Sequence, residues 1–161
     1  MILRVTVIGD PVGKGRPRFV RATGRTYTPE RTASWEADAA WAIRRAVPSD
    51  YAQPEKGAPL ALAIVAVFRR PARLVCSHKK PHARGIDSCP RGPQTTRVPH
   101  LTTPDADNVA KAAGDALVKA GAIHDDAQIC EVIVSKRYAA RGEGPAVHIT
   151  LHAGSSVPRS F

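Results

Sequence analysis

The chain has 161 residues, the length of one ordinary domain, and a domain of this size buries a hydrophobic core without disulfides. It contains 24 Lys and Arg against 14 Asp and Glu, which gives a net charge of +10 at pH 7. This surplus favours a polyanionic partner, because clustered cations gain affinity by releasing counterions from phosphates. Nucleic acid is therefore the first candidate partner. An anionic membrane is less favoured, since the sequence lacks a basic amphipathic helix.

The first residues and the cysteines indicate the cellular setting. The start, MILRVTVIGD, carries a charge at Arg4 and no long apolar run, so it predicts neither a signal peptide nor a membrane span. We expect a cytoplasmic protein. The three cysteines, Cys76, Cys89 and Cys130, are an odd number, which argues against a disulfide framework and predicts reduced thiols.

The N-terminal part predicts a strand, a loop, a helix and a second strand. Residues 3–9 alternate in the manner of a half-buried strand, and residues 10–29, rich in Gly, Pro and Arg, predict a loop with a short hairpin. Apolar side chains at helical spacing between Trp35 and Ala46 predict a helix that Pro48 ends. Residues 59–68 are apolar on both sides, which favours a central strand covered on both faces.

The C-terminal part begins with a long loop. Residues 69–103 hold eight Lys or Arg, one acid and five prolines without any period, which predicts a basic, mobile surface loop. Residues 109–120 repeat apolar side chains at helical spacing, and Gly121 ends this amphipathic helix. Alternating, β-branched stretches at 129–138 and 147–152 predict two further strands.

The predicted order is β-α-β-α-β-β, and the sequence shows no internal repeat. We therefore expect a single α+β domain over residues 1–153, with a mixed sheet and two main helices. Residues 154–161 predict a disordered tail.

The acidic residues are concentrated in one place, because five of them fall within 22 residues: Asp105, Asp107, Asp115, Asp125 and Asp126. The first two lie at the N-terminal edge of the second helix, where capping and the helix dipole favour acids for structural reasons alone. Asp107, Lys111 and Asp115 then follow at i, i+4 and i+8 on one polar face, a spacing that also makes helical ion pairs. Structural and functional explanations both remain open for each aspartate alone.

A second acidic site, Asp125 and Asp126, lies where the chain leaves this helix and enters the next strand. Because neighbours in an extended chain point to opposite faces, only one of the two joins Asp105 and Asp107, and the spacing does not say which. Crowded carboxylates repel one another unless a divalent cation lies among them, and hard oxygen ligands suit Mg²⁺ or Mn²⁺. Three carboxylates together therefore predict a metal site.

The acidic segment and the glycine-rich loop both resemble motifs of a known nuclease family. PDADNVAKAAGDALVKAGAIHDDAQI closely resembles the core motif of RusA-type Holliday junction resolvases, P-D-x-D-N-x-x-K, then an Asp four residues after that Lys, then D-D-A-Q. The segments GKGRPRF and YTP..T..WE resemble the N-terminal half of phage-type members. The resemblance covers most of the chain, although residues 72–100 match only loosely.

The resemblance implies specific roles for these residues. The family's catalytic, metal-binding aspartates fall on Asp105, Asp107 and Asp126, its essential lysine falls on Lys111, and Asp125 is left without a role. We take Asn108 and Asp115 as supporting residues. The resemblance also implies a homodimer, Mg²⁺ or Mn²⁺ as cofactor, and paired symmetric nicks in four-way DNA junctions during recombination and repair.

Basic residues around the glycine-rich loop suit contact with the DNA backbone, since each cation can meet a phosphate. A solvated basic loop is the alternative. The loop is not a P-loop, because one residue is missing between Gly9 and Gly13, and Gly15 stands where Ser or Thr should hold Mg²⁺. The predicted DNA contacts are Lys14, Arg16, Arg18, Arg21, Arg25, Arg69 and Arg70.

Another group of possible metal ligands lies in the long basic loop, at Cys76, His78, His82 and Cys89. Their spacing, Cys-x-His-x₃-His-x₆-Cys, matches no standard zinc motif, so chance grouping is the favoured interpretation. Metal analysis of the purified protein would decide between the two.

Two other classes of function compete with a nuclease. One is a catalytically silent protein that binds branched DNA and uses its acids structurally, and the other is a basic protein that binds acidic partners. The set Asp105, Asp107, Lys111 and Asp126 is complete, which favours the enzyme.

Overall fold

The computed structural model describes residues 1–16, 18–21, 24–78, 82, 85, 89, 91 and 97–156, and of Arg18, Val20 and Arg25 it describes the backbone alone. Most of the basic segment 79–96 and the end of the expected tail, 157–161, lie outside this part. The elements are β1 (Leu3–Ile8), β2 (Arg18–Val20), β3 (Arg25–Tyr27), α1 (Glu30–Ala46), β4 (Leu60–Phe68), η1 (Ala72–Leu74), α2 (Ala106–Ala120), η3 (Asp126–Gln128), β5 (Ile129–Tyr138) and β6 (Ala146–Ala153). This order confirms the predicted α+β arrangement, including the short hairpin of β2 and β3.

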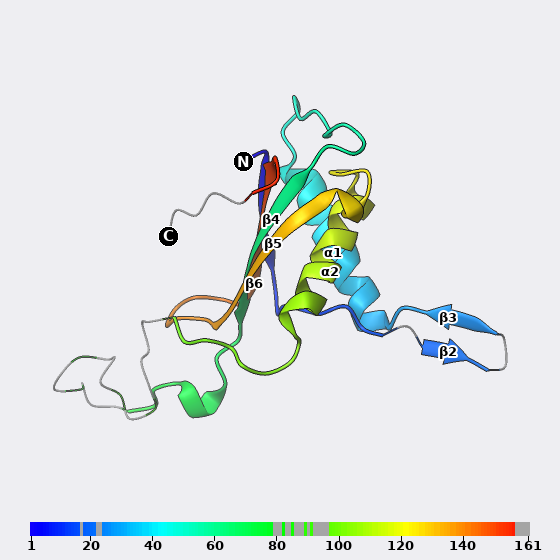
Figure 1. Cartoon of the computed structure of the whole chain (residues 1–161). Coiled ribbons are helices and arrows are strands. Elements are labelled where there is room, and N and C mark those ends of the chain that lie inside the picture. The colour runs from blue at the N-terminus through cyan, green and yellow to red at the C-terminus, as the bar shows by residue number, and fades with distance from the viewer. Residues whose placement is uncertain are drawn as a thin grey trace.

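The main sheet has four strands in the order β1-β6-β4-β5 (Figure 1). β6 pairs antiparallel with both β1 and β4, whereas β4 and β5 run parallel. The sheet is therefore mixed, as expected. Parallel neighbours need a long connection, and here the segment from residue 69 to residue 128, which includes α2, supplies it.

Both helices pack on the same face of the sheet (Figure 1). Ile43 of α1 and Leu117 of α2 are fully buried against side chains such as Leu62 of β4. Both helices cover one face of β4, and on the other face Ala61 and Val67 are fully buried whereas Ala63 and Val65 are half-buried. The expected cover on both faces is therefore confirmed only in part. An apolar pattern on both sides of a strand shows that both sides avoid water, but not that a helix covers each.

The last part of the expected mobile loop is fixed to the edge of the sheet. The backbone N–H of Tyr138 donates to the carbonyl of Val98 at 2.8 Å, and that of His100 donates to Lys136 at 3.1 Å. Residues 98–100 thus extend the pairing beyond β5 and hold the chain just before α2 in place. Within the described residues, no helix is both long and apolar enough to cross a membrane.

Candidate active site

The acidic edge of α2 begins with Asp105. Asp105 is the N-cap residue of α2, yet its exposed side chain makes no capping hydrogen bond. Helix capping was the structural explanation for an aspartate at this position. Because the helix forms without a hydrogen bond from this side chain, capping does not account for Asp105. The Asp105 carboxylate therefore faces solvent at the helix end where the dipole favours negative charge.

Asp107 follows in the first turn and is paired with Lys111. The Lys111 Nζ donates to Asp107 Oδ2 at 3.1 Å, and both side chains are more than half exposed. This hydrogen bond lowers the pKa of Asp107, so that its carboxylate stays ionised. The site thus combines two carboxylates and an ammonium on one exposed turn of α2.

The two aspartates of HDDAQ have different structural roles. The Asp125 side chain accepts a hydrogen bond from the backbone N–H of Ala127 at 2.8 Å, and the Gln128 side chain accepts from the backbone N–H of Asp125 at 3.2 Å. Gln128, which is buried, also donates to the carbonyls of Glu55 and Ala58. Asp125 and Gln128 therefore form a capping box that fixes this turn.

Asp126 instead lies beside α2. A Cβ built on Gly114 would lie 3.6 Å from the Cβ of Asp126, so the glycine leaves room for this aspartate. Gly114 follows Asp107 by two helical turns, about 10 Å along the axis, and thus lies on the same face of α2. The structure places Asp107, Lys111 and Asp126 along one side of this helix.

The three aspartates do not form a tight cluster in this single chain. In the part of the chain that the structure describes, the only group of three or more His, Cys, Asp or Glu residues whose ligand atoms converge as for one metal ion is Cys76, His78, His82 and Cys89. Ionised carboxylates repel one another. Even so, Asp105 and Asp107 offer exposed, hard oxygen ligands two residues apart, a donor set that fits Mg²⁺ or Mn²⁺.

The GKG loop joins both helices through Lys14. The Lys14 Nζ lies 2.7 Å from Glu36 Oε1 on α1 and 2.6 Å from Asp115 Oδ2 on α2. Burial opposes its charged form, but the hydrogen bonds and charges of Asp115 and Glu36 outweigh burial and raise the pKa of Lys14. Asp115 therefore has a partner other than Lys111, and the ammonium predicted to contact DNA is already paired.

The two glycines around Lys14 allow this close approach. A Cβ on Gly13 would lie 2.6 Å from the Cβ of Pro104, and one on Gly15 would lie 2.9 Å from the Cγ of Pro29. The backbone N–H of Lys14 also donates to the carbonyl of Asn108 at 2.8 Å. Gly13 thus packs on the start of α2 and Gly15 on the start of α1, which gives Asn108 a structural part through its backbone.

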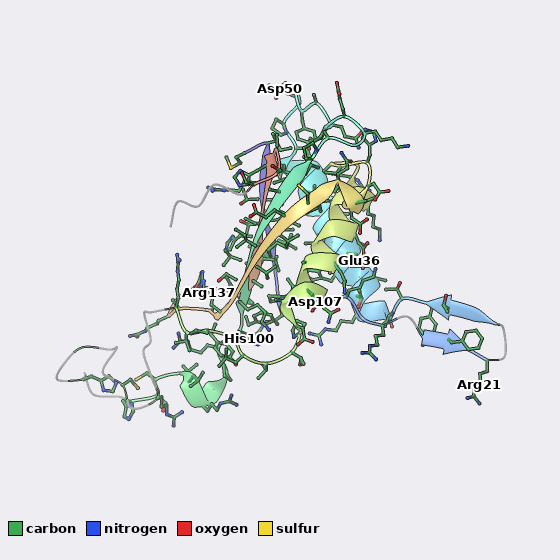
Figure 2. All side chains as sticks on the ribbon, in the orientation of Figure 1. Arg21, Glu36, Asp50, His100, Asp107 and Arg137 are labelled. Carbon is green, nitrogen blue, oxygen red and sulfur yellow. The ribbon has the colours of Figure 1, made fainter. Side chains whose placement is uncertain are left out.

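The other predicted DNA contacts differ in how exposed they are. Arg16 and Arg21 are exposed, and Figure 2 shows Arg21 at the far end of the hairpin. Arg69 is 75% exposed and donates to Asp10 at 3.4 Å, whereas Arg70 is half-buried and donates through Nε to the carbonyl of Ala139 at 2.8 Å. The side chains of Arg18 and Arg25 lie outside the described part of the structure.

A hollow of about 540 Å³ lies beside the acidic edge, between the starts of α1 and α2 and the end of β4. Arg31, Arg69 and His100 contribute to its wall, together with Thr103 and Pro104 just before Asp105. The hollow therefore has two arginines in its wall and extends to the segment that leads directly into Asp105.

Sequence reasoning missed His100 and Lys136, which shape this region. The His100 ring stacks on Phe68 with centroids 3.7 Å apart, and burial, with a smaller effect of Lys136, lowers its pKa. The Lys136 Nζ donates to the carbonyls of Thr102 at 2.8 Å and Pro104 at 2.6 Å. Both act through contacts between distant segments, for which the sequence pattern carries no signal.

The chain matches one known family over most of its length. The family model for endodeoxyribonuclease RusA matches residues 9–152, from the GKG loop to the end of the sheet. No curated protein matches the chain. Because the match spans most of the sequence and includes all four residues of the predicted catalytic set, the chain belongs to the RusA endodeoxyribonuclease family of Holliday junction resolvases.

Proposed function

We propose that this protein is a Mg²⁺- or Mn²⁺-dependent endonuclease that resolves four-way DNA junctions by paired symmetric nicks, in recombination and repair. Family membership supports DNA hydrolysis. The observation that carries the finer proposal is the exposed acidic face of α2, where Asp105 makes no cap and Asp126 lies alongside. This face adjoins a hollow lined by Arg31 and Arg69.

Asp105 and Asp107 are the proposed primary metal ligands, and Asp126 completes the set from the same side of α2. A divalent cation bound there would lower the pKa of a water molecule and neutralise charge on the reacting phosphate. Asp107 would hold such a cation through the carboxylate that now pairs with Lys111, and the Lys111 ammonium would then be available to stabilise charge on the scissile phosphate. In the free chain Lys111 lies 3.1 Å from Asp107, and its hydrogen bond lowers the pKa of that carboxylate.

DNA contact is assigned to exposed cations of the hairpin and of the hollow. Arg16 and Arg21 extend along the hairpin side, and Arg69 and Arg31 line the hollow. Arg18 and Arg25 remain proposed contacts from the sequence. Lys14 and Arg70 are held by groups of the protein itself, so we now assign both to structure rather than to DNA.

A homodimer follows from the reaction, because two symmetric nicks need two equivalent sites. The face of the sheet opposite the helices offers a mixed surface for a second copy, apolar on β4 and polar on β1 and β6, where Arg4, Thr6, His148 and Thr150 lie. It carries the half-buried side chains of Ala63, Val65 and Ile133, and Ile8 at its edge is 81% exposed. We propose this face as the dimer interface.

The proposal is tested by incubating the protein with an end-labelled four-way junction and with a matching duplex, with and without Mg²⁺, and mapping cuts on every strand. We expect symmetric nicks in the junction only, and only with the metal. The Asp107→Asn variant should lose nicking by at least about a thousandfold while it still binds the junction, since it removes one charge from the metal ligands.

A matched control is Asp38→Asn, which changes another aspartate on the exposed side of α1. It should nick at the parent rate. If Asp107→Asn cleaves normally in Mg²⁺, the assignment fails. If the parent protein binds the junction but never nicks it with any divalent metal, the alternative of a catalytically silent junction-binding protein replaces the enzyme.

A further inference from the structure

The basic segment between β4 and α2 holds a cluster of four sulfur and nitrogen ligands that the nuclease activity does not use. We propose that Cys76, His78, His82 and Cys89 bind one zinc ion as a structural site. The spacing of these residues along the chain argued against a zinc motif. The structure reverses that interpretation, because coordination requires convergence in space and not a particular spacing.

Two of the sulfur–nitrogen distances within the cluster match a tetrahedral site, and the remaining ligand atoms lie within about 1 Å of that geometry. One ligand atom from each residue lies within 4.8 Å of every other. Cys76 Sγ lies 3.4 Å from His78 Nδ1 and 3.1 Å from His82 Nε2, and Cys89 Sγ lies 3.7 Å from His78 Nδ1. Zinc bonds of ordinary length at tetrahedral angles separate such ligand atoms by about 3.3 to 3.8 Å.

The donor chemistry selects the metal. Two thiols and two imidazoles suit zinc, whereas Mg²⁺ and Mn²⁺ prefer the hard oxygens found on α2. All four tetrahedral positions are taken by side chains, so no position remains for water or substrate. The site is therefore structural rather than catalytic.

The surroundings explain why such a site would be useful. Cys89 is only 5% exposed, yet it does not belong to the hydrophobic core that the helices and the sheet share. Residues 69–103 contain eight Lys or Arg and five prolines, a composition that cannot build a core of its own. A zinc ion supplies cross-links between ligands that a segment of this kind otherwise lacks.

The experiment measures zinc directly. The protein is expressed with zinc in the medium, dialysed against metal-free buffer with a thiol reductant, and assayed for metal per chain by mass spectrometry. The parent protein should hold about one zinc per chain, and the double variant Cys76→Ser/Cys89→Ser should hold almost none. The matched control is Cys130→Ser, because Cys130 is an exposed thiol on β5 outside the cluster, and this variant should keep its zinc.

Replacement of zinc by Co²⁺ gives a second readout. The parent and Cys130→Ser should show the intense visible bands of tetrahedral cobalt and the thiolate charge-transfer bands, and His78→Ala, which keeps both thiols, should weaken them. A reduced parent without zinc and without these cobalt bands would overturn the proposal, and so would zinc retained by the double-serine variant. Because the readout is metal content, its outcome is separate from that of the nicking assay.

Discussion

Lys14 connects the two helices that carry and support the acidic face. Its ammonium lies between Glu36 of α1 and Asp115 of α2, and the Glu36 side chain is only 10% exposed. Removing one partner of a poorly hydrated ion pair leaves the other charge without compensation. The side chain that sequence reasoning assigned to DNA thus has a structural role, because it links α1 to α2 through these two ion pairs.

Replacement of Lys14 by Met should therefore destabilise the fold. We expect a loss of about 1–3 kcal/mol in the free energy of unfolding, because two charged hydrogen bonds disappear and Glu36 stays buried. Urea unfolding measures this loss. The control is Lys119→Met, an exposed lysine in the last turn of α2, which should change stability by less than about 0.5 kcal/mol. Unchanged stability with weakened DNA affinity in Lys14→Met would instead return Lys14 to the DNA contacts.

The β2–β3 hairpin projects away from the body of the protein (Figure 1). Its two strands pair only with each other, and Phe19 and Tyr27 are 62% and 48% exposed. A two-stranded hairpin is marginally stable by itself in water. Nucleic-acid bases stack on exposed aromatic rings and phosphates bind exposed arginines such as Arg21, so the hairpin is suited to contact DNA.

The double variant Phe19→Ala/Arg21→Ala tests that role. We expect junction affinity to fall by about tenfold or more, since one stacking contact and one phosphate contact are lost. The slope of affinity against salt should also become shallower, while thermal stability stays unchanged. The matched control is Trp41→Ala, which removes an exposed aromatic ring beside Arg45 on α1. Equal affinities for the hairpin variant and the parent would exclude the hairpin as a DNA contact.

The dimer proposal concerns the assembled molecule. The mass of the parent protein, measured by size-exclusion with light scattering at micromolar concentration, should be that of two chains. Ile8→Glu places a charge on the open face of the sheet and should yield a monomer, because a buried unpaired charge opposes association. Leu101→Glu is the control, since Leu101 is 88% exposed but lies in the segment before α2. A parent protein of single-chain mass, or an Ile8→Glu variant that stays dimeric, would rule out this interface.

The sequence predicts individual elements well and their assembly poorly. α2 is recognisable because its apolar residues repeat at helical spacing and Gly121, with φ at +74°, ends it. The residues of β4, apolar on both sides, predicted a central strand correctly, but they did not show that both helices pack on one face while Ala63 and Val65 on the other stay half-buried. The partners of Lys14, the stacking of His100 and the convergence of Cys76 with Cys89 all depend on contacts between distant segments, which one sequence does not display.

In the candidate active site, too, the sequence predicted the residues but not their arrangement in space. The resemblance to the family motif favours Asp126 over Asp125 as a metal ligand, whereas the strand-parity argument from the residues left the choice open. In the structure Asp125 caps the turn with Ala127, whereas Asp126 lies beside Gly114 of α2, so the two aspartates differ in structural role. What the sequence could not supply is the spacing of the carboxylates, which lie along the helix face rather than in one tight cluster.

The measurement that tests the central claim most directly compares Asp126→Asn with Asp125→Asn in the same junction-nicking and unfolding assays. Asp126→Asn should lose nicking by at least about a thousandfold and keep the stability of the parent, since it removes a proposed metal ligand that caps nothing. Asp125→Asn should keep nicking and lose at most about 1 kcal/mol of stability, since it alters a cap. Full nicking by Asp126→Asn, or loss of nicking by a folded Asp125→Asn, would contradict the assignment of the acidic face of α2 as the active site.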